Sequence, residues 1–219
     1  MTDIMKGDTM ISKNCRAVLG CLAMMILMTS CVGIDTKVKI SGNGSGKVSA
    51  EYRLSEELVS FGELEANKAM LPVPLTRADV ENSLKGVKGL TLDSWSSRKD
   101  GTDLLIKTVI SFDSLDAFMR YLDPRGELAK HSQDSAGQHI VFTVGESLPA
   151  FDADMKQIAQ EAFAPYTFKF AVELPSPIKE AASQHPAVAV RQEGNTAIFE
   201  GQMKDIVASE IPPSMRLSW

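Results

Sequence analysis

The stretch that decides the fold is residues 34–54, IDTKVKISGNGSGKVSAEYRL. Its first part alternates between two faces, and one of them carries Ile34, Thr36, Val38 and Ile40. A second alternation covers residues 47–54, after the GNGSG run at 42–46. Side chains of a strand point alternately to its two faces, and glycine and asparagine supply the positive φ values of a tight turn. The stretch therefore predicts an antiparallel hairpin with one apolar face.

Capping signals predict where helices follow. Ser55 is placed to cap a first helix, and Thr76 with Asp79 forms a capping-box pattern before a second. Asp113 is predicted to cap a third helix, which Pro124 stops. A fourth is predicted over residues 155–163, with an apolar stripe and Pro165 behind it.

Alternating apolar residues predict the remaining strands. They are expected near 91–97, 104–112, 140–144 and 168–174, with a short hairpin that turns at 193–195. The polar segment 125–137 is predicted to be a loop. The fold class expected from this order is α+β, a mostly antiparallel sheet with helices packed on one face. We expect one domain over 34–210 and a C-terminal tail over 211–219.

Composition and charge exclude several classes of protein. The 219 residues are 44% hydrophobic and 23% charged, which is ordinary for a globular chain. The formal net charge is −5, and residues 31–219 carry 20 basic and 26 acidic side chains. This balance argues against a nucleic-acid partner and against docking of a basic patch on anionic lipid.

The first 30 residues have the organisation of an export signal. Lys13 and Arg16 precede an uncharged run of 12 residues, 17–28, and small side chains then lead to Cys31. A membrane-spanning helix needs about 20 apolar residues, so the run is too short for a span. Two alternatives remain open, a plain secretory signal and a retained anchor, and translation could start at Met1 or Met10.

The residues before Cys31 resemble a known processing motif. Met28-Thr29-Ser30-Cys31 is similar to the bacterial lipobox, whose cysteine is acylated and becomes the new N-terminus after cleavage. The resemblance implies a lipoprotein signal peptide over 1–30, lipidation at Cys31 and a short lipid-anchored tether over 31–33. The implied localisation is the bacterial cell envelope, on the inner or the outer membrane.

Cysteine placement limits how the folded part is stabilised. Cys15, Cys21 and Cys31 are the only cysteines, and residues 32–219 contain none. A disulfide within that part of one chain and a cysteine zinc site there are both excluded.

The motifs tested for catalysis are absent. Gly42–Lys47 lacks the first glycine and the final Ser or Thr of a phosphate-binding loop. His131, His139 and His185 are the only histidines, and no two of them have metal-binding helical spacing. His131 and His139 could meet Asp134 by folding of the loop, although a polar surface loop is the simpler interpretation. We therefore expect a protein that is not an enzyme, with no catalytic residues, no cofactor and no metal.

An apolar connection joins the first two predicted helices. It runs from Ala69 to Leu75 as AMLPVPL, and loops of this composition need to be covered. One interpretation is a buried connection packed over the sheet. The other is a lipid-contact loop formed by Met70, Leu71, Val73 and Leu75.

The processing cysteine, the alternating strand, the GNGSG turn, the second strand KVSAEYRLS and the acidic helix start together resemble the LppM-type bacterial lipoproteins. The resemblance covers mainly residues 31–65 and implies an envelope protein whose α+β domain binds lipids or glycolipids. The expected partners are the membrane, through the lipid anchor, and a lipid or glycolipid ligand. The alternative function is a non-catalytic envelope scaffold or protein-interaction module.

Overall fold

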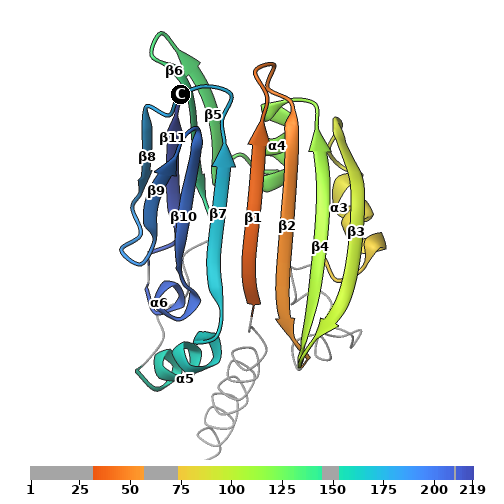
Figure 1. Cartoon of the computed structure of the whole chain (residues 1–219), viewed down its shortest axis with the longest axis vertical. Helices are drawn as coiled ribbons and strands as arrows, with labels where there is room; N and C mark the ends of the chain where they lie inside the picture. Colours follow the sequence, from red (N-terminus) through yellow and green to blue (C-terminus); the bar gives the residue numbers. More distant parts are fainter. Residues whose placement is uncertain (1–31, 57–73, 145–152, 210) are drawn as a thin grey trace, which may run out of the picture.

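The computed structural model describes residues 32–56, 74–144, 153–209 and 211–219, which form two sheets and the helices beside them (Figure 1). The larger sheet has the strand order β3-β4-β2-β1-β7-β10-β9. Its strands are β1 Val32–Ile40, β2 Gly46–Ser55, β3 Leu90–Asp100, β4 Asp103–Phe112, β7 Thr167–Glu173, β9 Ala189–Glu193 and β10 Thr196–Gln202. The smaller sheet, in the order β5-β6-β11-β8, contains β5 Ala129–Asp134, β6 Gly137–Thr143, β8 Glu180–Ser183 and β11 Ser214–Ser218. The helices are α3 Arg77–Leu84, α4 Leu115–Leu122, α5 Ala153–Phe163 and α6 Met203–Val207.

The hairpin predicted from residues 34–54 is confirmed. β1 and β2 are antiparallel from the pair Val32–Leu54 to the pair Ile40–Gly46. Gly44 takes a positive φ of 82° in the turn, a conformation that other residues adopt only at a cost. At Gly46 a Cβ would come within 2.3 Å of the Phe112 ring, so the sheet leaves no room for a side chain there.

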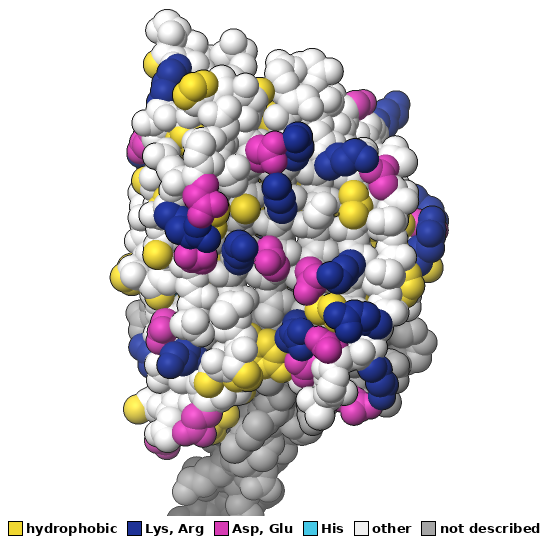
Figure 2. Space-filling model, in the orientation of Figure 1, with side chains coloured by type: hydrophobic (Ala, Val, Ile, Leu, Met, Phe, Trp, Pro, Cys, Tyr) yellow, Lys and Arg dark blue, Asp and Glu magenta, His cyan; other side chains and the backbone are white. Residues whose placement is uncertain are grey.

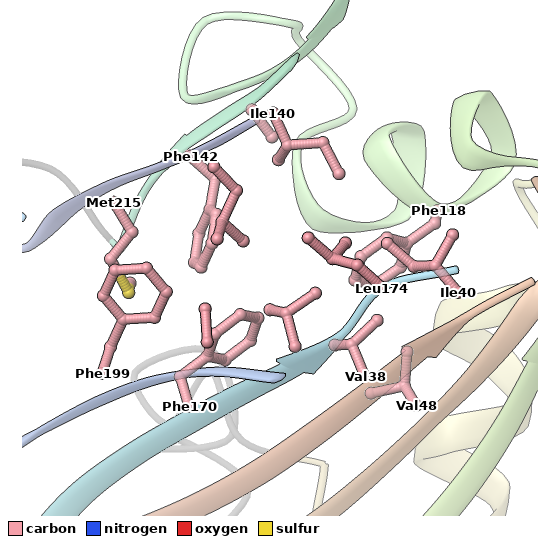
Figure 3. Packing of buried hydrophobic residues seen from close by; sticks show 14 of the residues in the cluster. Val38, Ile40, Val48, Phe118, Ile140, Phe142, Phe170, Leu174, Phe199 and Met215 are labelled. Atoms are coloured by element: carbon pink, nitrogen blue, oxygen red, sulfur yellow. The ribbon is translucent and has the colours of Figure 1, made fainter. Parts of the chain in front are cut away.

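The apolar face of the larger sheet forms the main core. Val38 on β1 pairs with Val48 on β2 and with Val172 on β7, and all three are buried. Phe170 and Phe199 continue this face across β7 and β10 and meet the smaller sheet (Figure 3). The rings of Phe142 and Phe170, one from each sheet, have their centroids 4.6 Å apart. The space between the two sheets is therefore filled by side chains.

The opposite face of the larger sheet carries charged side chains. Figure 2 shows residues of both signs spread over it. Several form ion pairs between strands. Lys37 and Lys39 of β1 pair with Glu173 of the neighbouring β7 at 3.2 and 2.7 Å, and Lys47 of β2 pairs across β4 with Asp93 of β3 at 2.7 Å. Exposed ion pairs of this kind contribute little to stability because water screens them. Their main effect is to keep this face polar.

Of the predicted helix starts, one is confirmed and another is wrong. Thr76 caps α3 with the predicted reciprocal bonds to Asp79. The prediction of Asp113 as the cap of the next helix is wrong, because Ser114 is the N-cap of α4 and accepts from the Ala117 amide. Asp113 lies instead against Gly89, whose carbonyl accepts its backbone N–H. The helix that was predicted from Ser55 lies largely outside the described residues, and Ser55 itself is the last residue of β2.

The segment predicted as a loop over 125–137 contains β5, so that prediction is wrong. Asp123 organises the approach to β5 by accepting from the amides of Arg125 at 3.1 Å and Ala129 at 3.0 Å, and from that of Leu128. Burial raises the pKa of Asp123, but these backbone hydrogen bonds outweigh it and hold the pKa below its ordinary value. A polar strand forms here because β5 is an outer strand with one face in water.

The predicted tail over 211–219 belongs to the folded core. β11 pairs with β6 on one side and β8 on the other, and Met215 and Leu217 are buried. A boundary at residue 211 is therefore wrong, since the last strand lies inside the smaller sheet.

The fold class is α+β and mostly antiparallel, as predicted. The layer that covers the apolar face of the larger sheet differs from the prediction, because it contains the smaller sheet as well as α3 and α4. The pair β1–β7 is parallel. None of the helices in the described ranges is both long enough and apolar enough to cross a membrane.

Candidate functional site

The end of the larger sheet nearest Cys31 combines the start of β1 with the end of β2. Val32 pairs there with Leu54, and the β3–β4 hairpin closes the same end (Figure 1). We call this region the Cys31 end, and it comprises residues 32–35 of β1, 52–55 of β2 and 100–106 of the hairpin. An extended chain spans at most about 3.6 Å per residue, so the Cα of Gly33 lies within about 7 Å of the Cα of Cys31.

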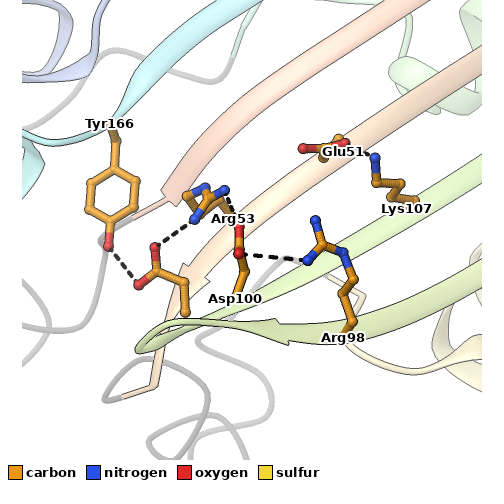
Figure 4. Close-up of polar contacts among 7 residues, drawn as sticks. Glu51, Arg53, Arg98, Asp100, Lys107 and Tyr166 are labelled. Carbon is orange, nitrogen blue, oxygen red and sulfur yellow. Dashed lines mark hydrogen bonds and ion pairs between the residues drawn. The ribbon is translucent and has the colours of Figure 1, made fainter.

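An ionic network crosses the polar face at the Cys31 end (Figure 4). Arg53 donates through Nη2 to Asp100 Oδ2 at 2.6 Å and through Nη1 to Asp103 Oδ2 at 3.4 Å. The Tyr166 hydroxyl donates to the other oxygen of Asp103 at 3.5 Å, and Arg98 lies 3.6 Å from Asp100. The hydrogen bond from Arg53 lowers the pKa of Asp100, which stays charged at neutral pH. The network thus links β2 to β3, β4 and the residue that precedes β7.

A half-open groove of about 190 Å³ lies beside this network. Its lining includes Gly33, Asp35, Glu51, Arg53, Tyr166 and Thr167. Gly33 permits this geometry because a Cβ at that position would come within 3.3 Å of Tyr166 Cδ1. The groove therefore offers charges of both signs and one aromatic ring to a small polar group.

The other face of the Cys31 end is apolar. Leu54 and Ile106 are fully buried, and four residues pack on them while remaining partly exposed: Tyr52, Leu75, Trp95 and Leu104. Tyr52 is enclosed enough that burial, with the nearby Tyr121 adding to it and a hydrogen bond to Thr108 opposing it, raises its pKa to about 12. The indole Nε1 of Trp95 is buried and has no hydrogen-bond partner among the described residues. The four partly buried side chains therefore leave some apolar surface exposed on this face, whereas the Trp95 Nε1 does not reach solvent.

Of the histidines that were considered for metal binding, His131 and His139 lie on the β5–β6 hairpin. His139 Nε2 lies 3.1 Å from Asp134, so these two residues do meet. His131 contacts Gln138 at 2.6 Å and Asp116 at 3.4 Å instead. In the parts of the chain that the structure describes, no group of three or more His, Cys, Asp or Glu residues could hold a metal ion.

The structure places one of the predicted lipid-contact residues. Leu75 packs beside Leu54 and Ile106, as a residue that covers the sheet would. Cys31, Met70, Leu71 and Val73 lie outside the described residues. The sequence analysis missed Arg53, Asp103, Tyr166 and Trp95, which come from three different strands and the connection before β7. The one signal in the sequence is Arg53 itself, a charged residue next to buried Leu54 at the end of a strand.

Solved structures that are similar to this chain include one from a mycobacterium. It is the NMR structure of the folded domain of LppM from Mycobacterium tuberculosis, with a TM-score of 0.47 and 7% sequence identity. The match covers 87% of this chain and 91% of that one. The likeness is distant and lies in the arrangement of strands and helices. No family model and no curated protein matches the chain.

Proposed function

We propose that this protein is a membrane-anchored lipoprotein of the bacterial cell envelope, and that the Cys31 end of its domain binds lipid or glycolipid. The observation that carries the proposal is the start of β1 at Val32, directly after the predicted acylation site. With a tether this short, acyl chains on Cys31 would hold the groove and the apolar face at the lipid surface. The proposed role is binding, without catalysis.

The chemistry of the Cys31 end suits contact with a lipid. Tyrosine and tryptophan prefer the boundary between hydrocarbon and water because each has an apolar body and a polar tip. Tyr52 lies on the apolar face of β2, while Arg53 and the groove lie on the opposite face of the same strand. We propose that the apolar face contacts acyl chains and that the groove contacts the polar headgroup. Filled packing between the two sheets favours binding at this end over binding between the sheets.

Leu75→Ser is expected to reduce the amount of lipid that copurifies with the protein about tenfold. Leu75 completes the apolar face over Leu54 and Ile106, and loss of about 1.5 kcal/mol of apolar contact corresponds to about a tenfold change in affinity. Native mass spectrometry of the full chain, released from detergent micelles, measures the lipid-bearing fraction.

Leu122→Ser is the matched control, because Leu122 is an exposed leucine at the end of α4, outside the Cys31 end. It should leave the lipid-bearing fraction unchanged. Recovery of wild-type protein without lipid, in repeated preparations, would contradict lipid binding and favour the envelope scaffold or protein-interaction module.

A further inference from the structure

His185 is a buried titratable side chain at the connection between the two sheets. It follows β8 of the smaller sheet and precedes β9 of the larger one, and only 2% of its surface is exposed. Its Nδ1 accepts a hydrogen bond from the Ala187 amide at 3.1 Å, and its carbonyl accepts from the Val188 amide at 3.1 Å. Its own amide donates to the Ser183 hydroxyl at 3.2 Å. The residue therefore forms the centre of the turn that joins the sheets.

The hydrogen bond at Nδ1 determines the protonation state that the fold accepts. An imidazole nitrogen that accepts a hydrogen bond carries no proton, so in the folded protein the proton of neutral His185 lies on Nε2. A second proton would have to bind Nδ1. It would remove the acceptor of the Ala187 amide and leave two N–H groups facing each other next to a buried charge. The turn is thus compatible only with the neutral imidazole.

The surroundings of His185 offer little compensation for a positive charge. On β9 and β10, Arg191 pairs with Glu193 and Glu200. Glu180 of β8 lies 3.8 Å from Arg216 of β11, and α6 contributes Lys204 and the exposed Asp205.

None of these charged groups is within ion-pair distance of the His185 imidazole. Nε2 has no well-formed hydrogen bond among the described residues, although the carbonyl of Ile206 favours the protonated form. Burial outweighs that carbonyl and lowers the pKa of His185.

The two strands that His185 connects are both outer strands. β8 has only four residues, Glu180–Ser183, and pairs with β11, while β9 has five, Ala189–Glu193, and pairs with β10. Short outer strands can separate from a sheet without unfolding the strands behind them. We propose that His185 is an acid-sensitive latch, so that protonation of its imidazole opens the turn and releases β8 and β9 from the edges of their sheets. This inference is independent of the proposed lipid binding.

The sign of the pH dependence follows from the neutral state that the fold requires. The latch is fully closed above the ordinary histidine pKa of 6.5 and loses stability as pH falls from there toward the lowered pKa of the folded state. Hydrogen exchange of the full chain at pH 7.5, 6.5 and 5.5, corrected for intrinsic exchange rates, should show this loss. We expect protection of residues 187–193 to fall by up to about tenfold per pH unit below 6.5, while protection of β1 and β2 is unchanged.

The variant His185→Asn distinguishes an effect of His185 protonation from a general effect of acid on the protein. The asparagine Oδ1 can accept from the Ala187 amide as Nδ1 does, but it does not titrate. Protection of residues 187–193 should then be the same at all three pH values. His139→Asn, which removes a titratable side chain at the β5–β6 hairpin, should retain the wild-type pH dependence. Unchanged pH dependence in His185→Asn would overturn the latch.

A measurement on the wild-type protein does not depend on whether the variant folds. Nitrogen NMR of the imidazoles should show His185 as the Nε2–H tautomer at pH 7.5 and neutral at pH 6.5. A histidine that titrates at its ordinary pKa, with protection of residues 187–193 unaltered, would overturn the proposal.

Discussion

Cys31→Ser is expected to abolish incorporation of labelled fatty acid and to move the protein from the membrane fraction to the soluble fraction. Serine lacks the thiol that the lipobox resemblance implies is acylated. Each buried methylene contributes about 0.8 kcal/mol, so two or more acyl chains hold a protein on a membrane almost permanently. Metabolic labelling and membrane fractionation measure the two effects, and each is expected to be nearly complete.

Cys21→Ser is the matched control for this prediction. Cys21 also follows small and apolar residues, as VLGC, but too few apolar residues precede it for an export signal. Cys21→Ser should therefore label and fractionate as the wild type does. Labelling that persists in Cys31→Ser would contradict acylation at Cys31, and with it the account of the tether.

Phe199→Ala is expected to destabilise the fold by about 3–5 kcal/mol, the usual cost of removing a buried phenylalanine. Phe199 is 0% exposed, pairs with Phe170 across β10 and β7, and belongs to the core cluster that contains Met215 of the smaller sheet (Figure 3). The alanine would leave a cavity where the two sheets meet. The free energy of unfolding of such a domain is about 5–15 kcal/mol in total, so the expected loss is a large part of it. Urea unfolding followed by circular dichroism measures it.

Ile211→Ala is the control for the core prediction, because Ile211 is 52% exposed. Its effect should stay within about 0.5 kcal/mol, as for most surface changes. A loss below about 1 kcal/mol for Phe199→Ala would show that the two sheets do not pack through this side chain.

The parts of the fold that the sequence predicted are those set by local pattern. The β1–β2 hairpin follows from period-two alternation around the GNGSG turn, and the start of α3 follows from Thr76 and Asp79. Both features depend on residues close together in the chain. Ser114, rather than Asp113, caps α4 because either residue can cap a helix and only the final backbone geometry selects one.

The parts that were missed depend on pairing between distant segments. The segment that contains β5 was predicted to be a loop because it is polar, and one face of β5 is in water. β11 was predicted to be part of a tail, and it is a short strand that follows two prolines. β11 becomes an inner strand only when β6 and β8 reach it from elsewhere in the chain. No pattern of neighbouring residues in the sequence predicts this pairing.

The candidate site shows the same division. Acylation at Cys31 and the lipid-contact loop stay predictions from continuous motifs, and of their residues only Leu75 is described. The network of Arg53, Asp103 and Tyr166 could not be predicted, because its members are 50 and 63 residues apart and meet only across the sheet. The need for glycine at position 33 could not be predicted either, because it comes from the ring of Tyr166, which is distant in the sequence.

The most direct test of the central claim, that the Cys31 end lies at the lipid surface, is fluorescence quenching by nitroxide-labelled lipids in vesicles. One dye is attached at Thr102→Cys in the β3–β4 hairpin and another, in a second variant, at Asn43→Cys in the β1–β2 turn, with Cys31 acylated and the other native cysteines replaced by serine. The nine residues of β1 separate these turns by about 30 Å. We predict strong quenching at residue 102 and almost none at residue 43. Equal quenching at both positions, or stronger quenching at residue 43, would contradict the account.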